Sequence, residues 1–87
     1  MINRYLTKLE QKTFKTFLTN KDCKLVAKET NYSESTVNKI LGCKTKLNDT
    51  NVTILNEFMK LTEIRMIEKL SLIHKFNDEL ILKFITT

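Results

Sequence analysis

Glycine occurs once in this chain, at Gly42, and proline does not occur at all. The tight turns of β-hairpins depend on glycine and similar turn residues, so this composition argues against a fold built from many short strands. Apolar residues recur instead at intervals of three and four, which is the spacing of one face of an α-helix. A chain of 87 residues has room for one domain. We therefore expect a single all-α domain over residues 1–87, a compact bundle of about five helices.

The overall composition is that of a folded, water-soluble chain, with 41% hydrophobic and 29% charged residues. No apolar run approaches the ~20 residues that cross a bilayer. The first residues also lack the apolar stretch of a secretion signal. We expect a cytoplasmic protein without a membrane partner.

Residues that could carry catalysis are few and isolated. Cys23 and Cys43 lie far apart, neither belongs to a Cys-x-x-Cys pair, and we expect both to be free thiols, buried or half-buried. His74 has no nucleophile or carboxylate at helical spacing on its own face, as a catalytic histidine would require. We therefore expect neither an enzyme nor a metal or cofactor site.

Positive charge is concentrated in the first part of the chain. Up to Asn48 there are ten lysines and arginines against four acidic residues, whereas the remainder holds five basic and six acidic residues. The codon bias of an AT-rich genome would explain abundant lysine but not its uneven distribution. Such asymmetry is typical of a polyanion-binding half joined to a neutral half.

The apolar pattern predicts a first helix over residues 3–19, whose inner face consists of Leu6, Leu9, Phe14, Phe17 and Leu18. Two shorter helices are expected over 22–31 and 33–41. Apolar periodicity resumes after residues 49–50 and continues to Phe76. Because a helix of 35 residues is uncommon in a small domain, we expect a break near residues 61–63 and a second near 77–78.

Residues 22–42 carry the most informative pattern, two short helices joined by a tight turn. Ala27 is small enough for two crossing helices to approach closely, and Asn31 tolerates the left-handed backbone of a sharp turn. Ser33 is a good cap for the second helix, and Gly42 is suited to its end. Tyr32 is expected to fill the crossing. The second helix would then bury Val37 and Ile40 and expose a wholly polar face: Glu34, Ser35, Thr36, Asn38 and Lys39.

The run from Ala27 to Ile40 resembles the helix-turn-helix of bacterial and phage repressors. It is most similar to the lac repressor family headpiece, with its Ala-x-x-x-Gly-Val-Ser-x-x-Thr-Val-Ser-Arg pattern. Gly42-Cys-Lys and Val52-Thr-Ile-Leu are similar to that family's Asn-Gly-Lys loop and the helix after it. The likeness spans about residues 22–61. Asn31 replaces the turn glycine, an extra helix precedes the motif, and no sugar-binding domain follows, so we expect no small-molecule effector.

The resemblance implies binding to double-stranded DNA, with the second helix in the major groove. Ser35 and Lys39 take the positions that read bases, and Lys39 could donate to guanine. Glu34 could accept from cytosine, or it could only favour the helix N-terminus. The remaining candidate DNA-binding residues are suited to phosphate or lie on the same face: Lys24, Ser33, Thr36, Asn38, Lys44 and Lys46.

The C-terminal segment, residues 62–87, is more apolar than its share of a small core requires. It could pack back on the first helix, or it could form a dimer through a helical face made of Met66, Leu70, Ile73, Leu80 and Phe84. We favour a homodimer, because paired reading heads recognise longer sites. The preferred function is a small transcriptional repressor or regulator of phage or mobile-element type. The alternative is a helix-turn-helix fold used as a protein-interaction or virion-assembly module.

Overall fold

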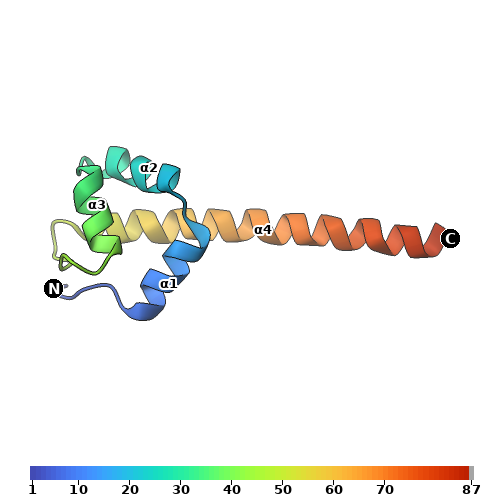
Figure 1. Ribbon diagram of the computed structural model, residues 1–87, viewed down its shortest axis with the longest axis horizontal. Coiled ribbons are helices and arrows are strands. Elements are labelled where there is room, and N and C mark those ends of the chain that lie inside the picture. Colours follow the sequence, from blue (N-terminus) through green and yellow to red (C-terminus); the bar gives the residue numbers. More distant parts are fainter. Residues whose placement is uncertain (87) are drawn as a thin grey trace.

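The computed structural model describes the backbone of residues 1–86 and the side chains of residues 1–77. Within that range the chain forms four α-helices: α1 (Lys8–Phe17), α2 (Asn20–Thr30), α3 (Glu34–Leu41) and α4 (Val52–Thr86). The first three gather around the beginning of α4, which then continues as a single rod (Figure 1). The all-α class is confirmed, but the described residues form four helices rather than about five.

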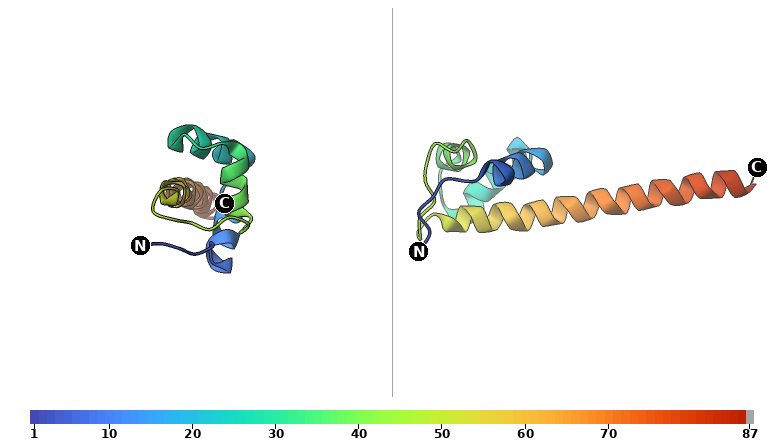
Figure 2. Two further views of the ribbon diagram at one scale, coloured as in Figure 1. Left: turned by 90° about the vertical axis from the view of Figure 1, so that its left-hand side faces the viewer. Right: turned by 90° about the horizontal axis from the view of Figure 1, so that it is seen from below.

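The molecule is elongated because α4 runs far beyond the other helices. Its principal extents are 58 × 24 × 19 Å and its radius of gyration is 17.2 Å, whereas a compact chain of this length would have a radius of about 12 Å. At 1.5 Å per residue, the 35 residues of α4 span about 52 Å. We call residues 1–65 the head and residues 66–86 the rod. An end-on view shows α1, α2 and α3 around one side of α4 (Figure 2).

The breaks expected in the last helix, near residues 61–63 and 77–78, are wrong. A helix ends where a residue cannot continue it or where the chain must turn back to cover a core. Neither condition holds here, because residues 52–86 contain no glycine or proline. Leu61 and Thr62 are themselves buried against the head, and a kink there would expose them.

The core of the head is centred on Phe58, which is fully buried on α4. The centroid of its ring lies 5.2 Å from the centroid of the Phe14 ring on α1. Ala27 on α2 and Val37 on α3 are also buried, as their positions in the sequence predicted. Leu47 closes the core from the loop before α4. Among the residues whose side chains are described, the apolar core consists of Leu6, Phe14, Leu18, Cys23, Val26, Ala27, Val37, Ile40, Leu47, Ile54, Leu55, Phe58 and Leu61.

The first helix starts at Lys8 and not near residue 3, which corrects the predicted range. Thr7 caps it in a capping box: the Thr7 hydroxyl accepts from the Glu10 N–H at 3.1 Å, and the Glu10 carboxylate accepts from the Thr7 N–H at 2.8 Å. Before this cap the chain is extended, and Arg4 exchanges two backbone hydrogen bonds with Leu47. Leu9 lies five residues before the buried Phe14, about 140° away around the helix, and is therefore 74% exposed instead of facing the core.

The turn between α2 and α3 has the backbone geometry that its sequence predicted. Asn31 ends α2 in the left-handed region, with φ 60° and ψ 23°. Ser33 caps α3, and its hydroxyl accepts from the Thr36 N–H at 3.1 Å. At the other end of α3, Gly42 has an ordinary φ of −80°, and the following Cys43 adopts the left-handed conformation with φ 59°. The helix thus ends at Gly42 as expected, but the residue in the left-handed conformation is Cys43 and not the glycine.

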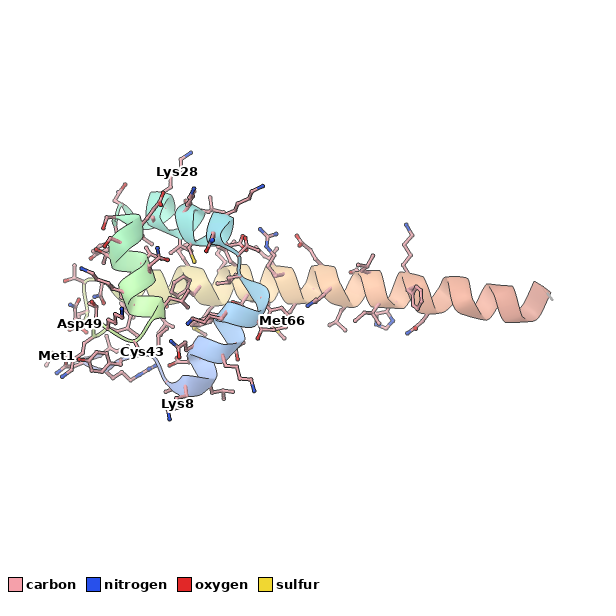
Figure 3. The ribbon with its side chains drawn as sticks, in the orientation of Figure 1. Met1, Lys8, Lys28, Cys43, Asp49 and Met66 are labelled. Atoms are coloured by element: carbon pink, nitrogen blue, oxygen red, sulfur yellow. The ribbon has the colours of Figure 1, made fainter. Side chains whose placement is uncertain are left out.

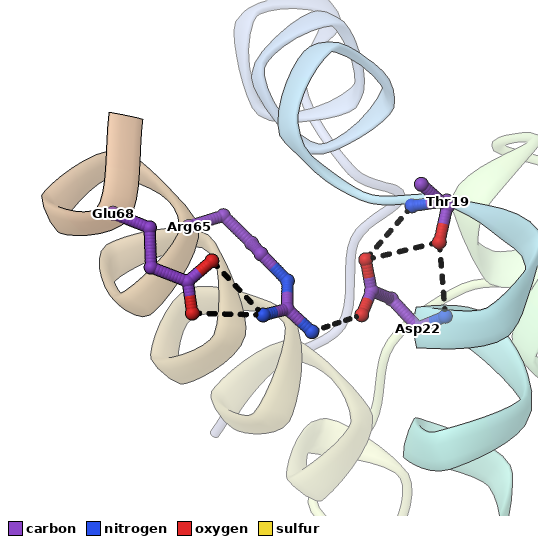
Figure 4. Close-up of polar contacts among 4 residues, drawn as sticks. All are labelled: Thr19, Asp22, Arg65 and Glu68. Carbon is purple, nitrogen blue, oxygen red and sulfur yellow. Dashed lines mark hydrogen bonds and ion pairs between the residues drawn. The ribbon is translucent and has the colours of Figure 1, made fainter. Parts of the chain in front are cut away.

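A polar network fastens α2 to the last turn of the head (Figure 4). Arg65 on α4 donates to Asp22 on α2 at 2.8 Å and also pairs with Glu68 at 3.1 Å. Asp22 accepts from the N–H and hydroxyl of Thr19 through its other oxygen. The Asp22 side chain is 5% exposed, so these contacts satisfy a carboxylate that has lost most of its water. The Arg65 hydrogen bond is the main cause that lowers the pKa of Asp22 below its usual value.

The left-handed backbone at Asn31 predicts a difference between two substitutions. Asn31→Gly should leave stability nearly unchanged, because glycine adopts this conformation without strain. Asn31→Val should destabilise the fold by about 1–2 kcal/mol, because a β-branched side chain clashes with the backbone there. Urea unfolding followed by circular dichroism measures both. Equal stability of the two variants would show that the turn does not require this geometry.

The buried carboxylate predicts a loss of stability in acid. The lowered pKa of Asp22 means that its charged form favours the folded state above the usual aspartate range, and that this contribution is lost as pH falls through the lowered value. Asp22→Asn should cost about 1.5–3 kcal/mol at neutral pH, because it breaks charged hydrogen bonds, and should flatten the acid dependence. Glu10, whose pKa the hydrogen bond with Arg4 lowers to about 2, should supply the residual dependence.

The matched control is Glu68→Gln. The Glu68 side chain is 60% exposed, so its removal should change stability by no more than about 0.5 kcal/mol. Thermal unfolding between neutral and acidic pH compares the three proteins. If Asp22→Asn unfolds along the same pH curve as the wild type, the buried pair contributes nothing to acid sensitivity.

Candidate nucleic-acid interface

The outer face of α3 is polar and accessible. Glu34, Ser35, Asn38 and Lys39 are exposed, while Val37 on the opposite face is fully buried. Tyr32 is half-buried and packs against the core at the start of this helix. The rod leaves the head away from α3, as Figure 3 shows, so it does not cover this face. The helix therefore presents short polar side chains to the surroundings.

Helix α1 lies beside the C-terminal end of α3. The side-chain amide of Gln11 donates to the main-chain oxygen of Leu41 at 2.9 Å, which satisfies one of the carbonyls left unpaired at a helix end. Lys15 follows one turn later on the same face of α1. This contact brings the ammonium-bearing side of α1 next to the exposed face of α3.

The loop after α3 folds back over the end of the helix. The Gly42 N–H donates to the main-chain oxygen of Asn38, and the Lys44 N–H donates to the main-chain oxygen of Lys39, both at 2.8 Å. These bonds hold residues 42–44 close to the last turn of α3. Lys44 is therefore fixed near Lys39 although it lies outside the helix.

Together these three segments form one shallow concave surface, which we call the lysine groove. It is lined by Gln11, Lys15, Ser35, Asn38, Lys39, Gly42 and Lys44. No acidic residue lines it, and none of its three lysines forms an ion pair with a carboxylate among the side chains that the structure describes. Like charges gathered without counter-charges create a positive potential, which attracts a polyanion.

A second depression lies between α2 and the beginning of α3. It is lined by Asn20, Cys23, Lys24, Glu34 and Asn38. Lys24 thus flanks α3 on the side opposite to Lys15 and Lys44. Glu34 lies in the first turn of α3, where a carboxylate is favoured by the helix dipole. Asn38 lines both depressions and lies between the two groups of lysines.

The structure separates the nine predicted site residues into groups. Ser35, Asn38, Lys39 and Lys44 meet in the lysine groove, and Lys24 and Glu34 lie beside it. Ser33 and Thr36 are engaged with each other instead, because their hydroxyl oxygens lie 2.9 Å apart in the cap of α3. Lys46 also lies apart, with its ammonium 5.6 Å from the centre of the Tyr5 ring, a cation–π contact.

Gln11 and Lys15 belong to the groove but were not among the predicted site residues. The sequence does place Lys15 on the polar face of the first helix. What it lacks is a signal that this helix lies against the end of α3. The 2.9 Å hydrogen bond from Gln11 to Leu41 shows that contact only once the chain is folded.

Other kinds of site find little support within the described residues. No group of three histidine, cysteine or acidic side chains there is placed to hold a metal ion. Both cysteines are free thiols, with Cys23 buried and Cys43 half-buried, as predicted. Burial raises the pKa of Cys23, and nearby Asp22 adds to the shift. None of the described helices has the length and apolar character needed to cross a bilayer.

Comparison with protein-family models, with curated proteins and with solved structures finds no match to this chain.

The different roles of the two serines at the start of α3 can be separated by stability. Ser33→Ala should destabilise the fold by about 1 kcal/mol, because it removes the hydroxyl that caps the helix. Ser35→Ala should leave stability within about 0.5 kcal/mol, because Ser35 is exposed. Chemical unfolding measures both. A loss of stability in Ser35→Ala equal to that in Ser33→Ala would contradict this division.

Proposed function

We propose that this protein binds double-stranded DNA, with α2 and α3 acting as a helix-turn-helix and α3 lying in the major groove. The observation that carries the proposal is the lysine groove: three segments of the head bring three lysines to the accessible face of one short polar helix. Packing of the apolar core does not by itself explain why lysines from three segments gather at one face of α3. An enzyme site would instead require a nucleophile, acid–base pair or metal cluster.

The dimensions of α3 support insertion into DNA. An α-helix with its side chains is about 10–12 Å in diameter, and the major groove of B-DNA, about 12 Å wide, admits it. The eight residues of α3 would extend about 12 Å along the groove. Ser35, Asn38 and Lys39 are short or flexible enough to reach base edges from that position. Lys39 can donate to guanine O6 and N7, and Asn38 can pair with adenine.

The lysines around α3 are suited to the two phosphate backbones that border the groove. Lys15 and Lys44 lie on one side of α3, and Lys24 lies on the other. Phosphate contacts of this kind position a protein on DNA but carry no sequence information. Lys46 would add a contact farther along the backbone, from the loop before α4.

We also propose a regulatory role, in which the bound protein blocks access to its operator as a transcriptional repressor does. The likeness of residues 22–61 to repressor headpieces supports this role. The operator is to be identified by selection from random duplex DNA.

Salt dependence tests DNA binding directly. If the lysines neutralise phosphates, the logarithm of the association constant should fall linearly with the logarithm of salt concentration, with a slope of about −0.9 per phosphate contacted. Lys44→Ala should weaken binding to all sequences alike and make this slope about one unit shallower. Lys39→Ala should relax the preference at one base position, at a cost of about 1–3 kcal/mol.

The matched control is Lys75→Ala, which removes the same charge from the exposed rod and should leave affinity nearly unchanged. Fluorescence anisotropy with the selected duplex measures all four proteins. If binding is absent, or if Lys75→Ala weakens it as much as Lys44→Ala, the groove is not the DNA site. Absence of DNA binding would favour the alternative of a protein-interaction or virion-assembly module.

A further inference from the structure

The rod carries an apolar row that nothing in the described head covers. Met66, Leu70 and Ile73 are 43%, 54% and 52% exposed, and Met59 continues the row toward the head at 56%. A soluble helix usually buries such a row against another element. The row is therefore a surface on which a partner from outside the head could pack.

The spacing of the row is that of a coiled coil. Met59, Met66 and Ile73 are separated by intervals of seven, and Leu70 and Asn77 lie four residues after Met66 and Ile73. From Met66 onward this is the alternation of the core positions a and d in a heptad repeat, with Leu70 and Asn77 at position a. In the same register the a position between Met59 and Met66 is the charged Glu63. We call Met66, Leu70, Ile73 and Asn77 the seam, which begins after Glu63. Leu80 and Phe84 continue the same repeat in the sequence, but they lie outside the residues whose side chains the structure describes.

We propose that the seam pairs with the seam of a second copy of this chain to form a parallel, two-stranded coiled coil. In a parallel pair equivalent positions face each other, so Asn77 meets its own counterpart and the two amides can hydrogen-bond. In an antiparallel pair an a position faces a d position, which would place Asn77 against an apolar side chain and leave its amide unpaired. Leu at position a with Ile at position d, as in Leu70 and Ile73, favours higher oligomers by itself, but an asparagine at position a is a known determinant of register and oligomeric state, and Asn77 supplies it here.

The position of the seam leaves the head intact. At about 100° per residue, Met66 lies about 80° around the α4 axis from Phe58, which faces the core. A second helix can therefore approach the rod without displacing α1 or α2. The seam is continuous along the rod, and the parallel arrangement places both heads at the same end.

The area available fits a dimer. Ile67 and Phe76 flank the seam and are 56% and 60% exposed. With them, five apolar side chains on each helix, at about 60–120 Å² each, would bury roughly 600–1,200 Å². The upper end of that range reaches the lower limit of a stable interface, about 1,200 Å².

Sedimentation equilibrium of the full chain in the absence of DNA tests the pairing. The wild type should be a dimer. Leu70→Asp should weaken association by more than about tenfold, because it places two carboxylates in the seam. Ser71→Asp makes the same charge change one residue away, outside the seam, and should remain dimeric. Helix content from circular dichroism verifies that both variants fold.

Orientation is tested by Ile73→Cys under mild oxidation, followed by peptide mapping. In a parallel pair the two introduced thiols face each other and should form a symmetric disulfide. A monomeric wild type, a trimer or tetramer, equal association of Leu70→Asp and Ser71→Asp, or no symmetric cross-link would each overturn the proposal. Because these measurements use no DNA, their outcome is independent of the proposed DNA binding.

Discussion

Burial of Phe58 is the contact on which the rest of the head depends. Its ring meets Phe14 on α1, and the same stretch of α4 packs against α2. Helix α3 has only eight residues, too few to be stable in water by itself, and it is held in place by its packing on α2 and by the burial of Val37 and Ile40. The accessible polar face of α3 thus exists because its other face completes a core that α4 organises.

Much of this fold could be predicted from short-range signals. The end of α2 and the start of α3 depend on Asn31 and Ser33, whose conformations follow from their own chemistry. The start of α2 was predicted at residue 22 but lies at Asn20, because Thr19 caps the helix. The start of α1 depends on a distant partner instead. Arg4 is extended because it pairs with Leu47, and no local pattern announces that pairing. The continuity of α4 was missed because helix length was judged against a compact domain.

The candidate site was predicted only in part, because some of its residues are placed by local spacing and others by contacts between distant segments. Ser35, Asn38 and Lys39 share a helical face, so spacing alone placed them together. Lys44 was assigned through the likeness to repressor headpieces, and the backbone bond to Lys39 brings it to the groove. Lys15 reaches the groove only because Gln11 binds the end of α3. A contact between two helices that are distant in sequence produces no repeating pattern of apolar and polar residues. The side of the groove that α1 forms could therefore not be predicted from the sequence alone.

The ion pair between Arg65 and Asp22 joins the last turn of the head to α2. It lies where the rod begins, so it resists bending of the rod relative to the helix that supports α3. In a pair of chains joined by their rods, this stiffness would fix the separation of the two α3 helices. Each base pair inserted between two half-sites shifts one of them by about 3.4 Å and rotates it by roughly a tenth of a helical turn. If the heads bind DNA as proposed, a rigid pair of them could not follow that movement and would select operators by the length of their central spacer.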